Sequence, residues 1–338
     1  MRRIVIILTI SASLYPCFAG INGSVRIAAI RVSFLADDSP GTTGNGSFLL
    51  NAPIDTCGRY TIDPVPHDRS YFESQLVAVN NYYRSVSYGK FGLDLDQSIV
   101  FPFSDENSYV LPEKMDYYHP YNQTDLHDQR VTELFRDAIE TAYNDDEIDF
   151  SNYDHVVVFH AGIGQDFSLP FLDPTPEDIP STFIDGDMLQ EYVGGVLQFG
   201  TTTINQGIIL PETQNHLFYQ ESENIFFDAE EPCDYQYGLT GTFALMLGFA
   251  IGLPPLWDTN SGQSGIGIFG LMDQGSNNGR GLIPAPPDAW SRKFAGWELP
   301  LIAMPSKMIN LPSRSEDNLV QIPINETEYF LIENRTNW

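Results

Sequence analysis

Six histidines are the side chains best suited to hold a metal ion or to move protons in this sequence of 338 residues. Catalytic zinc takes nitrogen, thiolate or carboxylate ligands, and two histidines four residues apart on one helix can bind one ion together. No two histidines here have that spacing within a predicted helix. No Gly-x-Ser-x-Gly elbow occurs either, although a Ser/His/Asp triad built from distant residues stays open. The histidines are His67, His119, His127, His155, His160 and His216.

For three of these histidines, the surrounding sequence predicts a role. His216 follows Glu212 and lies shortly before a long apolar segment, so these two residues are candidate zinc ligands. His160 ends a predicted buried strand, where we expect a structural or site-lining role. His155 begins the same strand, and we expect it to be a solvated residue at its edge.

Oxygen-bearing side chains cluster in the loop after the apolar segment. Asp258 and Asn260 lie around a turn that ends at Gly262. Carboxylate and amide oxygens are the ligands that calcium prefers, so Asp258, Asn260 and the later Asp273 form a possible calcium site. Two alternatives stay open: the loop is an ordinary Asx turn, and Asp273 caps a helix.

A mixture of helices and strands must position these groups. Residues 239–252 are apolar nearly all round, which predicts a buried helix. Asp68 and Asp125 each precede apolar residues at helical spacing, so we expect both to cap helices. The predicted helices cover residues 68–86, 125–142, 239–252 and 287–297; the predicted strands cover 25–35, 91–103, 156–159, 192–210 (a strand or a hairpin), 320–322 and 329–332.

The apolar helix resembles the active-site helix of the immune inhibitor A family of secreted bacterial zinc metallopeptidases. That helix carries His-Glu-x-x-His, then x-x-Gly and an acidic residue, commonly in a run like Gly-Leu-Pro-Asp-Leu-Tyr-Asp. Residues 252–258 here read Gly-Leu-Pro-Pro-Leu-Trp-Asp. Similar blocks lie at 66–72, 159–162, 209–213, 265–279, 286–297 and 328–335. The resemblance implies an α+β, zincin-like metallopeptidase fold, with a mixed sheet and a buried active-site-type helix.

The resemblance also identifies the positions that should carry the chemistry. The two histidines of the family fall on Leu245 and Phe249, the catalytic glutamate falls on Met246, and the acidic third ligand falls on Pro255. Leucine, phenylalanine and proline offer no donor atom, and the thioether of methionine favours copper(I) over zinc. We therefore expect no retained catalytic residue and no zinc cofactor, and we expect the helix to have exchanged its metal site for core packing.

Two functions follow from this pattern. The preferred one is a catalytically inactive pseudopeptidase that binds a protein or peptide ligand or has a structural role, because sites rather than folds determine function. The alternative is an active extracellular zinc metalloendopeptidase that uses relocated ligands.

The net charge and the N-terminal sequence indicate which partners are expected and where the protein is located. The 45 acidic and 17 basic residues give a net charge of −28, which fits solubility or calcium binding and disfavours nucleic acid as a partner. Residues 1–19 pair Arg2 and Arg3 with a short apolar run, which predicts an export signal and a secreted or cell-surface protein. No later segment is long enough to span a membrane. Cys57 and Cys233 would remain, either as a disulfide or as two free thiols.

The predicted domain organisation is simple. We expect residues 20–300 to form the metallopeptidase-like domain and residues 301–338 to begin a following β-rich segment. The sequence stops directly after a strand-like run, so we expect it to be the front part of a longer protein, truncated at its C-terminus.

Overall fold

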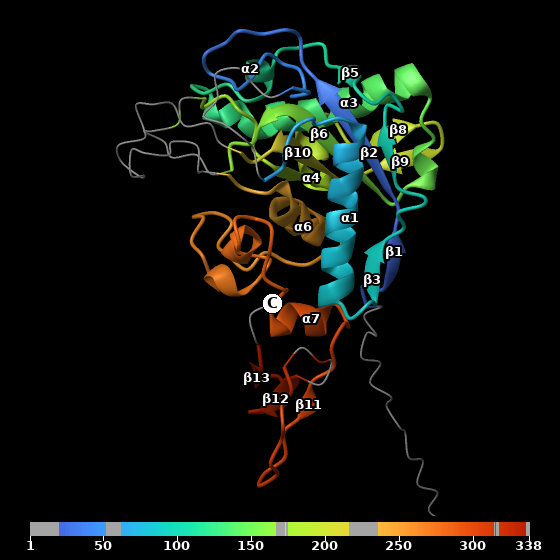
Figure 1. The fold of residues 1–338 in the computed structure, drawn as a ribbon. Helices are drawn as coiled ribbons and strands as arrows, with labels where there is room; N and C mark the ends of the chain where they lie inside the picture. The colour runs from blue at the N-terminus through green and yellow to red at the C-terminus, as the bar shows by residue number, and fades with distance from the viewer. Residues whose placement is uncertain are drawn as a thin grey trace, which may run out of the picture.

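A mixed β-sheet lies at the centre of the computed structural model, which describes residues 20–51, 62–166, 173, 175–215, 236–313, 315 and 318–335. The strand order is β4-β2-β6-β10-β7, and β5 also pairs with β2 (Figure 1). All these pairings are parallel except that of β7, which runs antiparallel to β10 at one edge. The strands are β2 (Ile27–Ser33), β4 (Ile99–Phe101), β5 (Tyr109–Val110), β6 (His155–Ile163), β7 (Thr182–Ile184) and β10 (Gly207–Thr213). The predicted α+β class with a mixed sheet is confirmed.

Helices cover both faces of this sheet, which explains why β2 and β10 are buried along their whole length. On one face, Phe159 of β6 contacts Phe72 of α1 (Arg69–Val86) and Phe243 of α6 (Leu239–Ala250), with ring centroids 4.7 and 5.6 Å away. On the other face, Phe135 of α3 (His127–Asp146) packs directly over Gly207. Helices α1 and α6 therefore lie side by side on one face, and α3 lies on the opposite face.

The two predicted helix caps have different outcomes. Asp68 caps α1, because its Oδ1 accepts the backbone N–H of Tyr71 at 3.0 Å. The prediction for Asp125 is wrong: this residue lies inside a 3₁₀ turn, η1 (Thr124–Leu126), and α3 begins after it with Leu126 as its N-cap. Asp125 is therefore part of the 3₁₀ turn, and the α-helical hydrogen bonds begin after it.

Two predicted strand regions are subdivided. Residues 91–103 form β3 (Phe91–Leu93) and β4, separated by a turn in which Ser98 donates to the carbonyl of Asp94; β3 pairs with β1 (Gly23–Val25). Residues 192–210 contain the hairpin of β8 (Leu197–Phe199) and β9 (Thr202–Ile204), followed by β10. A helix that the sequence analysis missed, α4 (Gly186–Tyr192), precedes this hairpin and is capped by Asp185.

The remaining elements surround the two ends of the sheet. Short helical segments are α2 (Met115–Tyr118), η2 (Phe150–Asn152), η3 (Gly267–Phe269), η4 (Gln274–Asn277) and α7 (Ala289–Phe294). A separate three-stranded sheet of β11 (Leu301–Ile302), β12 (Leu319–Pro323) and β13 (Tyr329–Glu333) confirms the two strands predicted near the C-terminal end. Buried Arg292 of α7 binds this sheet through Glu333 at 2.6 Å, and it also pairs with Glu298 at 2.8 Å.

Several predictions lie outside the described residues. These are the export signal at 1–19, the possible pairing of Cys57 with Cys233, and the position of His216. Among the helices that the structure does describe, none combines the length and the apolar character that crossing a bilayer requires.

Candidate functional site

Helix α6 presents two apolar faces that differ in burial. Phe243 and Leu247 are fully buried against the sheet and α1. The residues at the expected catalytic positions, Leu245, Met246 and Phe249, are only half-buried. The expectation of core packing is met only in part: these side chains pack against the hydrophobic core, but each keeps part of its surface exposed. An apolar face that is left partly open is available to a ligand.

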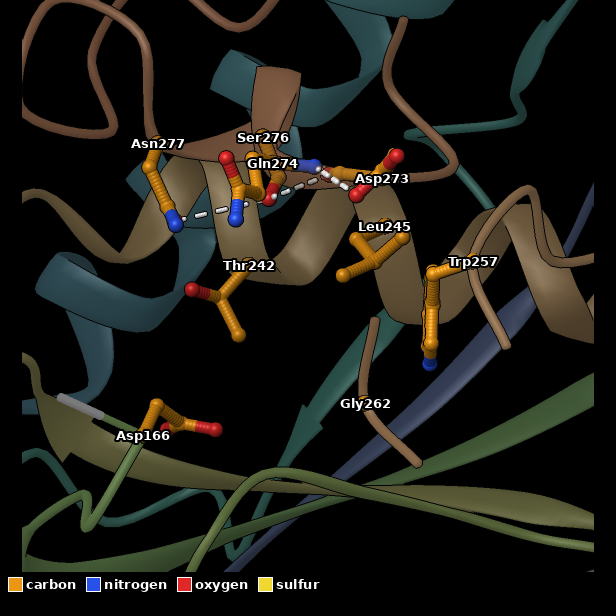
Figure 2. Close-up of a pocket in the computed structure, with 9 residues that line it drawn as sticks. All are labelled: Asp166, Thr242, Leu245, Trp257, Gly262, Asp273, Gln274, Ser276 and Asn277. Carbon is orange, nitrogen blue, oxygen red and sulfur yellow. Dashed lines mark hydrogen bonds between the residues drawn. The ribbon is translucent and has the colours of Figure 1, made fainter. Parts of the chain in front are cut away.

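A groove of about 210 Å³ runs along this open face (Figure 2). Leu245 and Thr242 point into it from α6, and Asp166 lies across the cavity from them, beyond the end of β6. The described residues that line the groove are Asp166, Thr242, Leu245, Trp257, Gly262, Asp273, Gln274, Ser276 and Asn277. Residues from four separate parts of the chain thus meet at the position where the resemblance predicts an active site.

Aromatic rings pack against one another at the apolar end of this groove. The ring of Phe249 lies 5.5 Å from that of Trp257 in an edge-on arrangement, and 5.9 Å from that of Phe183 on the edge strand β7. Aromatic pairs at these separations add about 0.5–1.5 kcal/mol each beyond the area they bury. Phe249, where the resemblance leads us to expect the second histidine, therefore packs against two other aromatic rings.

Asp273 organises a loop that forms another part of the lining. Its Oδ2 accepts the hydroxyl of Ser264 at 2.9 Å and the successive backbone N–H groups of Gly265, Ile266 and Gly267 at 2.8–2.9 Å. Burial acts to raise the pKa of Asp273, but these backbone donors outweigh it and lower the pKa. Its Oδ1 accepts the N–H of Gln274 and caps η4, so the predicted capping role is confirmed.

The loop at Asp258 is an Asx turn. Asp258 Oδ1 accepts the backbone N–H groups of Asn260 at 2.9 Å and Ser261 at 3.2 Å, and the bond from Asn260 is the main cause of the lowered pKa of Asp258. Within the described ranges, no group of three or more His, Cys, Asp or Glu side chains has metal-binding geometry. Calcium at Asp258, Asn260 and Asp273 stays a prediction, as does a relocated zinc site.

Glu212 belongs to a buried cluster that the sequence analysis did not identify. Its Oε2 lies 2.7 Å from Nδ1 of His67 and accepts the N–H of Leu49 at 2.8 Å, while its Oε1 accepts the N–H of Gly162 at 2.7 Å. The candidate zinc ligand thus joins the start of α1, the end of β6 and an N-terminal loop. A sequence signal existed, since a charged residue directly follows the apolar run of β10, but its partner is 145 residues away.

Asp63 extends this cluster to the first turn of α6. Its carboxylate accepts the N–H of Leu239 at 2.7 Å and the amide of Gln75 at 3.1 Å, and its carbonyl oxygen lies 3.0 Å from Nε2 of His67. Burial raises the pKa of Asp63. The cluster therefore fixes the N-terminal end of α6 relative to α1, and so fixes one wall of the groove.

The other described histidines lie away from the groove. His160 is fully buried and contacts Phe34, which agrees with the structural role expected for it, and burial lowers its pKa to about 4. The rings of His119 and His127 contact each other in a tilted arrangement, with centroids 4.0 Å apart. The prediction that His155 is a solvated edge residue is wrong: it starts β6, an interior strand, and is half-buried.

Gly241 controls how closely α6 approaches η4. A Cβ atom at Gly241 would lie 2.0 Å from the carbonyl oxygen of Ser276, a backbone atom in the groove wall. We expect Gly241→Ala to destabilise the fold by about 3 kcal/mol, the upper part of the usual range for overpacking. Urea unfolding measures this effect.

The matched control for this prediction is Gly186→Ala in α4. A Cβ atom there meets only Asn205 O at 3.5 Å, an ordinary contact. Replacing this glycine is expected to leave stability unchanged or to raise it by about 0.4–1 kcal/mol. Equal effects of the two substitutions would show that α6 and η4 are not in this close contact.

Comparison with known proteins adds no relationship: no protein-family model matches the chain, and no significant similarity to a curated protein is found.

Proposed function

We propose that this chain is a secreted, peptidase-like protein of the immune inhibitor A type that binds polypeptide in the groove beside α6 and does not cleave it with zinc. The proposal includes a zincin-like arrangement of the sheet and α6, and a location outside the cell or on its surface. The observation that carries it is the chemistry of one helix face: Leu245, Met246 and Phe249 lie half-buried on α6, and Leu245 lines the groove. These side chains offer contact area but no nitrogen or oxygen ligand.

The size and lining of the groove support a polypeptide ligand. About 210 Å³ is below the roughly 300–1,000 Å³ of sites that enclose small molecules, so the groove accommodates one or two side chains of a longer ligand. Thr242, Gln274 and Asn277 supply hydroxyl and amide groups that can bind peptide backbone. Leu245 and Trp257 supply the apolar contact.

Zinc content and proteolysis test the inactive part of this proposal. We expect the purified protein to contain far less than one zinc per chain and to leave casein intact, with or without a chelator. Stoichiometric zinc together with chelator-sensitive cleavage would contradict the proposal and favour relocated ligands.

A triple reversion tests whether the helix face is a former metal site. Leu245→His, Met246→Glu and Phe249→His together are expected to introduce zinc binding, because two imidazoles four residues apart on one helix can bind one ion. The control changes the same three residues to alanine, which removes side-chain bulk without adding a donor. Zinc uptake by the alanine variant would show that the metal binds elsewhere.

A further inference from the structure

One wall of the groove carries a carboxylate that has no cationic partner among the residues that the structure describes. Asp166 accepts the N–H of Ser181 at 3.1 Å and its hydroxyl at 2.8 Å, and it also accepts the amide of Gln214. None of the ion pairs formed within the described part of the chain includes Asp166. Burial raises the pKa of this carboxyl group, which reflects the cost of holding the charge there.

The contacts of Asp166 leave its charge directed at the groove. Its hydrogen bonds come from three neutral donors, the N–H and hydroxyl of Ser181 before β7 and the amide of Gln214 after β10, and they fix the carboxylate in place without neutralising it. Figure 2 shows the carboxylate pointing into the cavity opposite Thr242. A cation entering from solvent would gain a partly desolvated partner, where an ion pair is stronger than at the open surface.

The opposite end of the groove is apolar. Leu245 and Trp257 face the cavity, and Trp257 is held by Phe249 behind it. The lining also includes the neutral polar groups of Thr242, Gln274 and Asn277. A matching ligand therefore has a cation at one end and a large apolar side chain at the other.

The net charge of the whole chain also favours a ligand that carries positive charge. A net charge of −28 attracts cations over distances longer than a single contact and repels acidic segments. The attraction selects the sign of the ligand's charge, and the groove selects its shape.

We infer that the groove is selective for basic segments of polypeptide in which lysine or arginine lies close to a large apolar residue. The cation pairs with Asp166 and the apolar side chain packs on Leu245 and Trp257. This inference rests on the proposed polypeptide-binding function and adds the class of ligand to it.

Matched synthetic peptides test the selectivity by fluorescence anisotropy. The first is a short labelled Gly/Ser peptide with two lysines next to one phenylalanine. In the second, glutamates replace the lysines, and in the third, serine replaces the phenylalanine. We expect the first peptide to bind at least about tenfold more tightly than either of the others, a difference of about 1.4 kcal/mol.

Two variants assign the selectivity to the groove. Asp166→Asn is expected to weaken the lysine–phenylalanine peptide about tenfold, whereas Asp96→Asn, an equal change of charge at an exposed turn, leaves its affinity within about twofold. Trp257→Ala should weaken the two peptides that contain phenylalanine and leave the serine peptide unchanged. Circular dichroism of each variant shows that it is folded.

The outcomes separate the two proposals. Equal binding of the lysine and glutamate peptides would overturn the inferred selectivity and leave polypeptide binding intact. Equal losses in Asp166→Asn and Asp96→Asn would overturn the role of Asp166 in favour of general attraction by the acidic chain. Failure of all three peptides to bind, at low salt and in folded protein, would overturn polypeptide binding at this groove, and the selectivity with it.

Discussion

Replacing Glu212 with alanine is expected to lower the free energy of unfolding by about 3–5 kcal/mol, the usual cost of removing one partner from a buried ion pair. The side chain is 5% exposed, and its two oxygens accept from His67, Leu49 and Gly162. The substitution leaves two backbone N–H groups and one imidazole without an acceptor in an apolar setting. Urea unfolding followed by intrinsic fluorescence measures the loss.

A surface carboxylate provides the control for Glu212. Glu73 pairs with Arg69 at 2.8 Å on the same helix that His67 precedes, and its side chain is 46% exposed. We expect Glu73→Ala to cost at most about 1 kcal/mol, because solvent screens exposed pairs. If Glu212→Ala does not fold, Glu212→Gln serves instead, since it keeps the length of the side chain and loses the charge. A cost no greater than that of Glu73→Ala would contradict the clustered arrangement.

The stabilisation that Glu212 provides is expected to decrease as pH rises. Burial acts to lower the pKa of His67, but the hydrogen bond to Glu212 and the charge of that carboxylate outweigh burial, so the pKa is raised. Both ring nitrogens face acceptors, which favours the doubly protonated ring. The stabilisation is present in full below the unfolded-state pKa of about 6.5 and is lost as pH rises through the raised pKa. The difference between wild type and Glu212→Gln should therefore shrink at alkaline pH.

His160 is expected to make the fold sensitive to acid. Its ring is fully buried, and burial lowers its pKa to about 4 in the folded state, against about 6.5 in the unfolded chain. Between these values the unfolded chain binds the extra proton and the folded protein does not. Stability from this residue is present above about pH 6.5 and falls by about 3 kcal/mol as pH decreases to about 4.

The variant His160→Gln isolates this effect, because glutamine keeps polar atoms at the site and does not titrate. We expect the wild type to lose about 3 kcal/mol more than the variant between pH 7 and pH 4, measured by urea unfolding at each pH. Parallel stability curves for the two proteins would show that His160 does not carry the acid sensitivity.

Titration of Asp178 changes the stability of the fold in the opposite direction from titration of His160, so the two residues can be tested against each other. Burial raises its pKa to about 7, so the folded protein holds a proton there that the unfolded chain releases above about pH 4. Stability from Asp178 is gained as pH falls through this range. Asp178→Asn should therefore make the loss of stability toward acid pH steeper than in the wild type, whereas His160→Gln makes it shallower.

A large part of the fold follows from local sequence. Asp68 precedes apolar residues at helical spacing, and this pattern places the start of α1 correctly. The run at 239–252 predicts α6 because nearly every side chain in it is apolar. Asp125 shows where such reasoning fails, since a capping residue can also lie in a 3₁₀ turn that leads into the helix, and short-range spacing does not distinguish these two possibilities.

The chemistry of the expected catalytic positions is determined by the sequence alone. Leu245, Met246, Phe249 and Pro255 lack zinc ligands in any fold, because the identity of the side chain fixes its donor atoms. The sequence likewise fixes the acidic charge, which sets the sign of the field around the molecule.

Only the tertiary structure decides what the helix face and the buried carboxylates do. Helical periodicity shows that Leu245 and Phe243 lie on different faces of α6, but the packing of the sheet determines which face is covered. Strand order brings Glu212 to His67, 145 residues apart, and brings Asp166 across the groove from Leu245. Such contacts depend on which strands pair across long stretches of sequence. That pairing is determined by how the whole core packs, and local sequence patterns do not encode it.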